Sequence, residues 1–444
     1  MRIRERIVYQ DLGGLVPGTK NLNNAENKWL EELAPRLDPT SMLVPIKYSF
    51  TKHQDQAEPV LTRQLDGTWR AGRYIGEIRS GNTILEIRPR LGFPIIAAWA
   101  SAALNLKIVP RAAGKNGTSF LIAELQAAAW RRALVDAARH GMPAIRATEH
   151  HVGPSVRGRL DVPGTVPYRA RRSPNLVSLT QPKVVDNPVT RVIVLADRVL
   201  NTRIQRAGWR GPRIDEFIPH LRAATGPRPA LPTRRELRSV RYSPITQPYK
   251  AVADLSWLIA KNKGPQGDSS TDTHDGVLLD VAELWELFLL HCLRAAADDL
   301  TVTHGTTADL STHLLHAATG GQKLGRLLPD FIVGDDAAPT AIIDAKYKRL
   351  NDPFPVNRED LYQLTSYLAA HSGGGIRPRG ILAYPLLPDS AMSSAEANGP
   401  WSLQWGGGGT AEFLRLPIEA AGCIDRFTKI LSSDRDTVDR HNYS

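Results

Sequence analysis

The sequence contains very little cysteine and has no long apolar run. Its two cysteines, Cys292 and Cys423, form no Cys-x-x-Cys pair and cannot supply a thiolate zinc site, so we expect a reducing, cytoplasmic setting. The charged N-terminus is followed by no apolar stretch of signal-peptide length, and the most apolar candidate, Phe93 to Leu104, is too short to span a membrane. We therefore expect a soluble protein that is not exported.

Repeats and phosphate-binding motifs are also missing. No segment recurs at a fixed period, and none of the glycine clusters leads into the Gly-Lys-Ser/Thr ending of a P-loop. If the system to which this chain belongs needs nucleotide hydrolysis, another polypeptide must supply it.

Length and positive charge are the main compositional features. A chain of 444 residues with 42% hydrophobic residues predicts two or three folded domains. The 56 Lys and Arg residues exceed the 45 Asp and Glu residues, which gives a net charge of +11. This surplus favours a polyanionic partner through counterion release, although charge alone is weak evidence for nucleic-acid binding.

The sequence pattern predicts an α/β protein in three segments. Residues 1–205 mix strand and helix patterns, with a hairpin around Ser80-Gly81-Asn82, a helix from Phe120 to His140 and another starting at Asn187-Pro188. Residues 206–276 are expected to be a Pro/Arg-rich and helical connector, whose prolines break regular structure and whose arginines face either DNA or solvent. Within it, residues 262–276 are expected to be a loop, and residues 277–444 form the last domain.

The last segment carries the residues with the clearest chemistry. An apolar helix is predicted from Leu279 to Ala297 and includes Glu286. Two predicted strands follow, joined by a turn: one begins near Asp330, and the other contains Asp344 and Lys346. Residues two apart on a strand share a face, so Asp344 and Lys346 point the same way and a neighbouring strand can bring Asp330 beside them.

Two carboxylates and an ammonium group in this arrangement are typical of phosphodiester hydrolysis. The two carboxylates repel each other unless a hard divalent cation, Mg²⁺ or Mn²⁺, takes their oxygens as ligands. Such a metal polarises the scissile phosphate and activates a bound water, while Lys346 orients that water and offsets negative charge. The alternative interpretation is a surface hairpin with a solvated Asp and Lys.

A helix predicted from Glu359 to Ala370 adds two candidates to this site. Gln363 and Tyr367 are four residues apart, share a helical face, and can reach the active centre or the DNA backbone. Glu286 has two interpretations, as a third acidic group near the metal or as a group that holds its own helix. The histidine pairs His150-His151 and His313-x-x-His316, the latter expected on a helix, lack a third zinc ligand with supportive spacing.

At these residues the sequence resembles the McrC family, the nuclease subunits of McrBC-type modification-dependent (5-methylcytosine) restriction systems. Asp344-Ala345-Lys346-Tyr347-Lys348 is similar to the family's catalytic strand, and the segments around Trp285-Glu286, Asp360 to Tyr367 and Ile381 to Pro385 are similar to the elements around it. Looser landmarks lie upstream, at Tyr74-Ile75-Gly76, Leu85 to Arg90 and Val156 to Asp161. Arg90 stands where the family commonly has lysine, and the Gly- and Pro-rich insertions near residues 264 and 406 do not correspond to any of these landmarks.

The resemblance implies a fold, a partner and a substrate. It implies a C-terminal PD-(D/E)XK restriction-endonuclease-like domain, with a central mixed sheet flanked by helices, and an N-terminal half that docks onto the partner. That partner is implied to be a McrB-like AAA+ GTPase ring that recognises modified double-stranded DNA, so that GTP acts only through it. Two alternatives stay open: a non-catalytic DNA-binding or motor-stimulating subunit, and a stand-alone repair nuclease.

Overall fold

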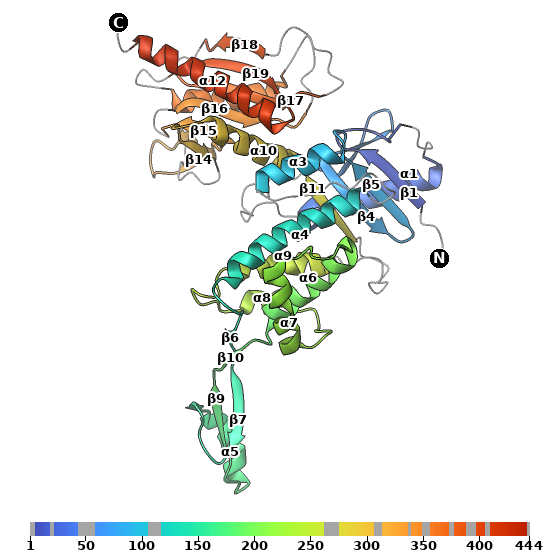
Figure 1. Cartoon of the computed structure of the whole chain (residues 1–444), viewed down its shortest axis with the longest axis vertical. Coiled ribbons are helices and arrows are strands. Elements are labelled where there is room, and N and C mark those ends of the chain that lie inside the picture. The colour runs from blue at the N-terminus through green and yellow to red at the C-terminus, as the bar shows by residue number, and fades with distance from the viewer. Residues whose placement is uncertain are drawn as a thin grey trace. The chain divides into compact units, whose positions relative to one another are not determined.

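The chain folds into two compact units, residues 1–122 with 271–444 and residues 123–270 (Figure 1). The computed structural model describes residues 5–17, 22–42, 58–104, 117–261, 275–305, 313–335, 339–348, 356–372, 377–387, 397–404 and 409–441. This division differs from the three sequence segments, because the chain leaves the first unit after residue 122 and returns to it at residue 271. No described helix is long and apolar enough to cross a membrane.

The first unit contains a four-stranded sheet. Its strands, in spatial order, are β1 (Glu5–Gln10), β5 (Thr83–Arg88), β4 (Tyr74–Ser80) and β11 (Asp275–Asp280). β4 and β5 pair antiparallel, which confirms the predicted hairpin, and β1 runs parallel to β5. A Cβ atom on Gly76 would lie 2.1 Å from the carbonyl oxygen of Val277, so glycine at this position allows β11 to approach β4.

β11 corrects part of the predicted loop before the last domain. Asp275 and Gly276 already lie in this strand, while residues 262–274 and the insertion near residue 264 lie outside the described residues. The strand pairs with β4, which lies far away in the sequence, and no local pattern reveals such a pairing.

One face of this sheet is apolar. It packs against α1 (Asn24–Leu33) and a small hairpin of β2 (Leu61–Arg63) and β3 (Trp69–Ala71), while η1 (Ala34–Arg36) and α2 (Pro39–Met42) follow α1. The buried core between them includes Ile7, Tyr9, Leu30, Leu33, Ile78, Leu85 and Ile87. Because side chains alternate along a strand, the residues between these apolar positions lie on the opposite face.

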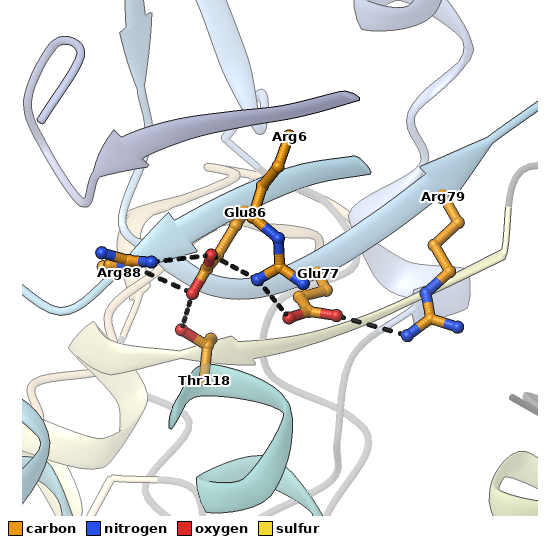
Figure 2. Close-up of polar contacts among 6 residues, drawn as sticks. All are labelled: Arg6, Glu77, Arg79, Glu86, Arg88 and Thr118. Atoms are coloured by element: carbon orange, nitrogen blue, oxygen red, sulfur yellow. Dashed lines mark hydrogen bonds and ion pairs between the residues drawn. The ribbon is translucent and has the colours of Figure 1, made fainter. Parts of the chain in front are cut away.

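The opposite face carries a network of charged side chains (Figure 2). Glu77 and Glu86 are direct cross-strand partners, and like charges so placed destabilise a sheet. Arg6 bridges them, with its Nη1 3.2 Å from Glu77 Oε1 and 2.6 Å from Glu86 Oε2. Arg88 and the Thr118 hydroxyl also donate to Glu86, whose side chain is fully buried. Burial would raise the pKa of Glu86, but these hydrogen bonds outweigh burial and lower the pKa.

Arg6→Ala is expected to lower the free energy of unfolding by about 2 kcal/mol, because it leaves two adjacent buried carboxylates without their shared partner. The shift of the urea denaturation midpoint measures this loss. Arg79→Ala is the matched control, since Arg79 makes a single contact of 3.4 Å to Glu77 from the same network and should cost less than about 1 kcal/mol. Equal losses would contradict a special role for the bridging geometry.

The first unit also contains a six-stranded mixed sheet. In spatial order its strands are β12 (Val302–His304), β15 (Phe331–Gly334), β16 (Pro339–Ala345), β17 (Arg379–Pro385), β19 (Thr410–Leu416) and β18 (Ala397–Ser402). β15 and β16 form the predicted hairpin, while β16, β17 and β19 run parallel to one another. The expected mixed sheet is therefore confirmed. The insertion near residue 406 lies outside the described residues.

Helices flank this sheet. α11 (Arg358–His371) packs Leu364 and Leu368 against Ile342 and Leu382, which puts α11 on the face that Asp344 shares with Ile342. The other helices of this region are α10 (Val281–Ala296), α12 (Ala420–His441) and α3 (Phe93–Leu104). α3 and α10 meet through Trp99 and Trp285, whose ring centroids are 4.8 Å apart. The predicted helices at 279–297 and 359–370 are confirmed, except that Leu279 and Asp280 belong to β11.

The second unit is mainly helical. α4 (Gly117–Ala138), α6 (Pro188–Ile204), α7 (Pro212–Thr225), α8 (Arg234–Ser239) and α9 (Tyr249–Lys261) share one apolar core. The remaining elements are β6 (Ile145–Arg146) with β10 (Lys183–Val184), the sheet of β7 (Glu149–Gly153), β9 (Leu176–Thr180) and β8 (Arg159–Leu160), and α5 (Val162–Ala170). The helices expected at 120–140 and from Asn187-Pro188 are confirmed, with Asn187 as the N-cap.

The expectation that the Pro- and Arg-rich stretch breaks regular structure is confirmed for residues 226–233, which lie in no helix or strand, but not for residues 212–225, which form α7. Pro212 starts α7 at a position where no backbone donor is needed, and Ile214, Ile218 and Leu221 recur at helical spacing and are buried. Two arginines of this stretch also form ion pairs within the unit. Arg210 and Arg222 both contact the buried carboxylate of Asp197.

Candidate active site

Asp330 and Asp344 meet where β15 and β16 pair. Asp330 directly precedes β15, and its Oδ2 accepts a hydrogen bond of 2.8 Å from the backbone N–H of Ala345. Asp344 lies in β16 and is 2% exposed. Burial, and then the neighbouring carboxylate of Asp330, raise the pKa of Asp344 to about 7, although Lys346 opposes both effects. The hairpin therefore holds two carboxylates close enough to repel each other.

Lys346 lies at the centre of a set of polar contacts on the same side of the sheet. Its Nζ is 2.5 Å from Asp344 Oδ2, 3.4 Å from Asp360 Oδ1, and donates a hydrogen bond of 2.7 Å to Gln363 Oε1. Burial lowers the pKa of Lys346, but the carboxylates of Asp344, Asp360 and Asp330 outweigh it and raise the pKa. The ammonium group is therefore protonated at neutral pH.

Gln363 and Tyr367 extend this network along α11. Gln363 Nε2 donates to the Tyr367 hydroxyl at 2.8 Å, and that hydroxyl donates to the carbonyl oxygen of Leu328 at 3.2 Å. Leu328 lies two residues before Asp330. The hydrogen bonds thus run from Lys346 through the helix and back to the segment that carries the first carboxylate.

Asp360 is a member of the site that the sequence analysis does not single out. Its side chain is 9% exposed and forms ion pairs with Lys346 and Lys348. Asp360 lies three residues before Gln363, on the same helical face, and this spacing is the signal that could have identified it.

Glu286 has a different environment. It is buried on α10, and its Oε1 lies 2.6 Å from Nε2 of His304 on β12, which is also buried. The described residues contain no group of three or more His, Cys, Asp or Glu side chains arranged to hold a metal. The structure therefore gives Glu286 a local partner, and its catalytic role stays a prediction.

The donor chemistry of the hairpin fits a hard divalent cation. Mg²⁺ is commonly held by one or two carboxylates, and water and substrate phosphate complete its coordination. Asp330 and Asp344 supply that number, and a cation between them would remove the repulsion that raises the pKa of Asp344.

The histidine pairs contribute nothing to this centre in the described residues. His313 and His316 lie on β13 (His313–His316), which pairs with β14 (Lys323–Arg326), so the helical expectation for them is wrong. His150 and His151 lie on β7 in the other unit.

Fold and site together define a two-unit α/β protein with a buried carboxylate and lysine centre on a mixed sheet. The family model described as "McrBC 5-methylcytosine restriction system component" matches residues 69–385. The chain belongs to this family.

One solved structure adds a likeness in fold. A chain of the refined half-complex from the tetradecameric assembly of Thermococcus gammatolerans McrB AAA+ hexamers with bound McrC is 14% identical. The match covers 98% of this chain and 100% of that chain, with a TM-score of 0.54. A chain of the cryo-EM structure of the Thermococcus gammatolerans McrBC complex is 16% identical over 65% of this chain and 87% of that one, with a TM-score of 0.36. No curated protein matches the sequence.

Proposed function

We propose that the chain is the metal-dependent endonuclease subunit of a McrBC-type restriction system that acts in defence against foreign DNA. The observation that carries this proposal is the convergence of Asp330, Asp344 and Lys346 on neighbouring strands, in a chain of the McrBC family. A partner-binding scaffold has no need of two close carboxylates beside a buried lysine, because their repulsion costs stability. In this proposal the sheet and helices of residues 277–444 form a PD-(D/E)XK nuclease domain.

Each side chain has a distinct role in the proposed reaction. Bound by Asp330 and Asp344, Mg²⁺ or Mn²⁺ would polarise the scissile phosphate and lower the pKa of a bound water. Lys346, protonated between its carboxylate partners, orients the attacking water and offsets charge that develops on the phosphate. Gln363 holds the ammonium group in place, and Tyr367 holds Gln363.

The proposed partner is an AAA+ GTPase ring. The structure similar in fold contains McrB AAA+ hexamers with bound McrC, and this sequence carries no P-loop of its own. We propose the same division of labour here: residues 1–205 contribute to docking on the ring, the partner recognises modified DNA and hydrolyses GTP, and this chain cuts.

The test is cleavage of modified and unmodified plasmid DNA by the full chain, with and without the AAA+ protein that co-purifies with it, GTP and Mg²⁺. Efficient cutting is expected only of modified plasmid, when partner, GTP and metal are all present, and EDTA should abolish it. Robust cutting by the pure chain without nucleotide would favour a stand-alone repair nuclease. No cutting in an assay where the partner hydrolyses GTP would favour a non-catalytic, motor-stimulating subunit.

A further inference from the structure

We propose that Tyr347 is a positioning residue for the catalytic lysine, held by Asp11 and Arg90 of the N-terminal sheet region. This inference rests on the proposed function, since it concerns the same site. It makes the cutting rate depend on a segment of the chain that contributes no group to the reaction.

Three residues that are distant in sequence meet at one buried point. The Tyr347 hydroxyl donates a hydrogen bond of 2.7 Å to Asp11 Oδ2. The other oxygen of Asp11 accepts a bond of 2.5 Å from the backbone N–H of Arg90. The Arg90 guanidinium lies over the Tyr347 ring, with 4.5 Å between its Cζ and the ring centroid. Asp11 follows β1 and Arg90 follows β5, so the N-terminal sheet positions both.

Aromatic contacts hold the ring from the side. The rings of Tyr347 and Trp99 of α3 are nearly perpendicular, with a centroid distance of 6.1 Å. Trp99 is itself fixed, because its Nε1 donates to the carbonyl oxygen of Ile418 at 2.8 Å and its ring packs on Trp285. Tyr347 is 6% exposed and has little room to move.

The position of Tyr347 in the chain connects this cluster to the reaction. It directly follows Lys346, whose backbone N–H donates to the carbonyl oxygen of Ala383 at 2.8 Å. Anchoring the Tyr347 side chain therefore fixes the backbone from which the Lys346 side chain extends toward Asp344 and Gln363. A misplacement of about 1 Å in a catalytic group can cost roughly 100-fold in rate.

The chemistry of the cluster favours positioning over simple packing. A carboxylate that is 1% exposed is costly to bury, and a phenylalanine with an apolar neighbour would fill the same volume without that cost. Burial raises the pKa of Asp11, although the Tyr347 hydroxyl and the Arg90 backbone N–H oppose it. The polar contacts of Asp11 and Arg90 hold the Tyr347 ring, and with it the end of β16, in one defined orientation.

Tyr347→Phe tests the inference, because it keeps the ring and removes only the bond to Asp11. In the full complex with partner, GTP and Mg²⁺, we expect the cleavage rate at saturating DNA to fall about 10- to 100-fold. The DNA concentration that gives half the maximal rate should stay near the native value, while the melting temperature should fall, because the buried Asp11 carboxylate loses a hydrogen-bond donor. Tyr9→Phe is the matched control, since Tyr9 is another buried tyrosine of the same region and packs in the apolar core of the N-terminal sheet.

A second pair of variants keeps the test decisive if Tyr347→Phe folds poorly. In Asp11→Asn the amide oxygen can accept from the Arg90 N–H while the amide NH2 donates to the Tyr347 hydroxyl, so this variant keeps both contacts and should cut at a near-native rate. Asp11→Ala removes both contacts and should lose rate as Tyr347→Phe does. Native rates for Tyr347→Phe or for Asp11→Ala would overturn the inference, as would an equal loss in Tyr9→Phe. Persistent cutting by Asp344→Ala would instead overturn the proposed active site, which separates the two failures.

Discussion

Asp344→Ala is expected to lose DNA cleavage by about 1,000-fold, because it removes one of two metal ligands and several kcal/mol of transition-state stabilisation. The same substitution removes the charge beside Lys346, whose Nζ lies 2.5 Å from Asp344 Oδ2. The measurement is the cleavage rate of modified plasmid in the complex with partner, GTP and Mg²⁺. Binding to the partner should not change, since the substitution lies in a buried strand of the sheet.

Asp335→Ala is the matched control for this variant. Asp335 is an exposed carboxylate next to the same hairpin, one residue beyond the end of β15, so its loss removes equal charge without touching the buried pair. The control should cut as the native protein does. If Asp344→Ala also cuts normally while the partner hydrolyses GTP, the chain is a scaffold or regulator, and another polypeptide contains the nuclease.

Much of the local structure around the site could be predicted from the sequence. Short apolar runs next to Asp330 and Asp344 indicated two paired strands, and β15 and β16 confirm that pairing. Helical spacing of Gln363 and Tyr367 placed both on one face, and they are hydrogen-bonded to each other in α11. These predictions succeeded because each depends on residues close in sequence, where strand or helix periodicity alone determines which side chains are neighbours.

Contacts between distant segments could not be predicted in this way. β11 joins the N-terminal sheet beside β4, and Asp11 contacts Tyr347, which lies 336 residues further along the sequence. Neither contact has a local signature, since a strand pattern does not specify its partner and a single Asp does not reveal its burial. The sequence does not distinguish Pro212, which starts a buried helix, from the prolines between residues 226 and 233, which lie outside helices and strands, because only tertiary packing shows the difference.

The environment of Glu286 also depends on a contact between separate elements of the fold, which the sequence could not predict. Its helix and its burial follow from the apolar pattern of α10, but the sequence left open whether it serves the metal or its own helix. The contact of 2.6 Å to His304 depends on β12 lying at the edge of the sheet, beside β15. Measuring Mg²⁺ affinity in Glu286→Gln would separate the two interpretations, because a ligand role lowers affinity and a purely local role does not.

The metal-free protein is expected to lose stability as pH rises, and Asp344→Asn should remove part of this loss. Burial and the carboxylate of Asp330 raise the pKa of Asp344 in the folded state to about 7, above the value of roughly 3.9 in an unfolded chain. Between these values the folded state binds more protons than the unfolded state. The stabilising contribution is therefore fully present below about pH 4 and is lost as pH rises through about 7.

Denaturation in EDTA at pH 5 and pH 8 measures the effect. Because the pKa of Asp344 is raised in the folded state, the native protein should lose more stability than Asp344→Asn between the two pH values. Mg²⁺ at pH 8 should restore stability to the native protein and not to the variant, because the metal replaces the proton between the carboxylates. Parallel pH profiles for the two proteins would mean that Asp330 and Asp344 do not form a repelling pair, which removes the electrostatic basis for a metal at this hairpin.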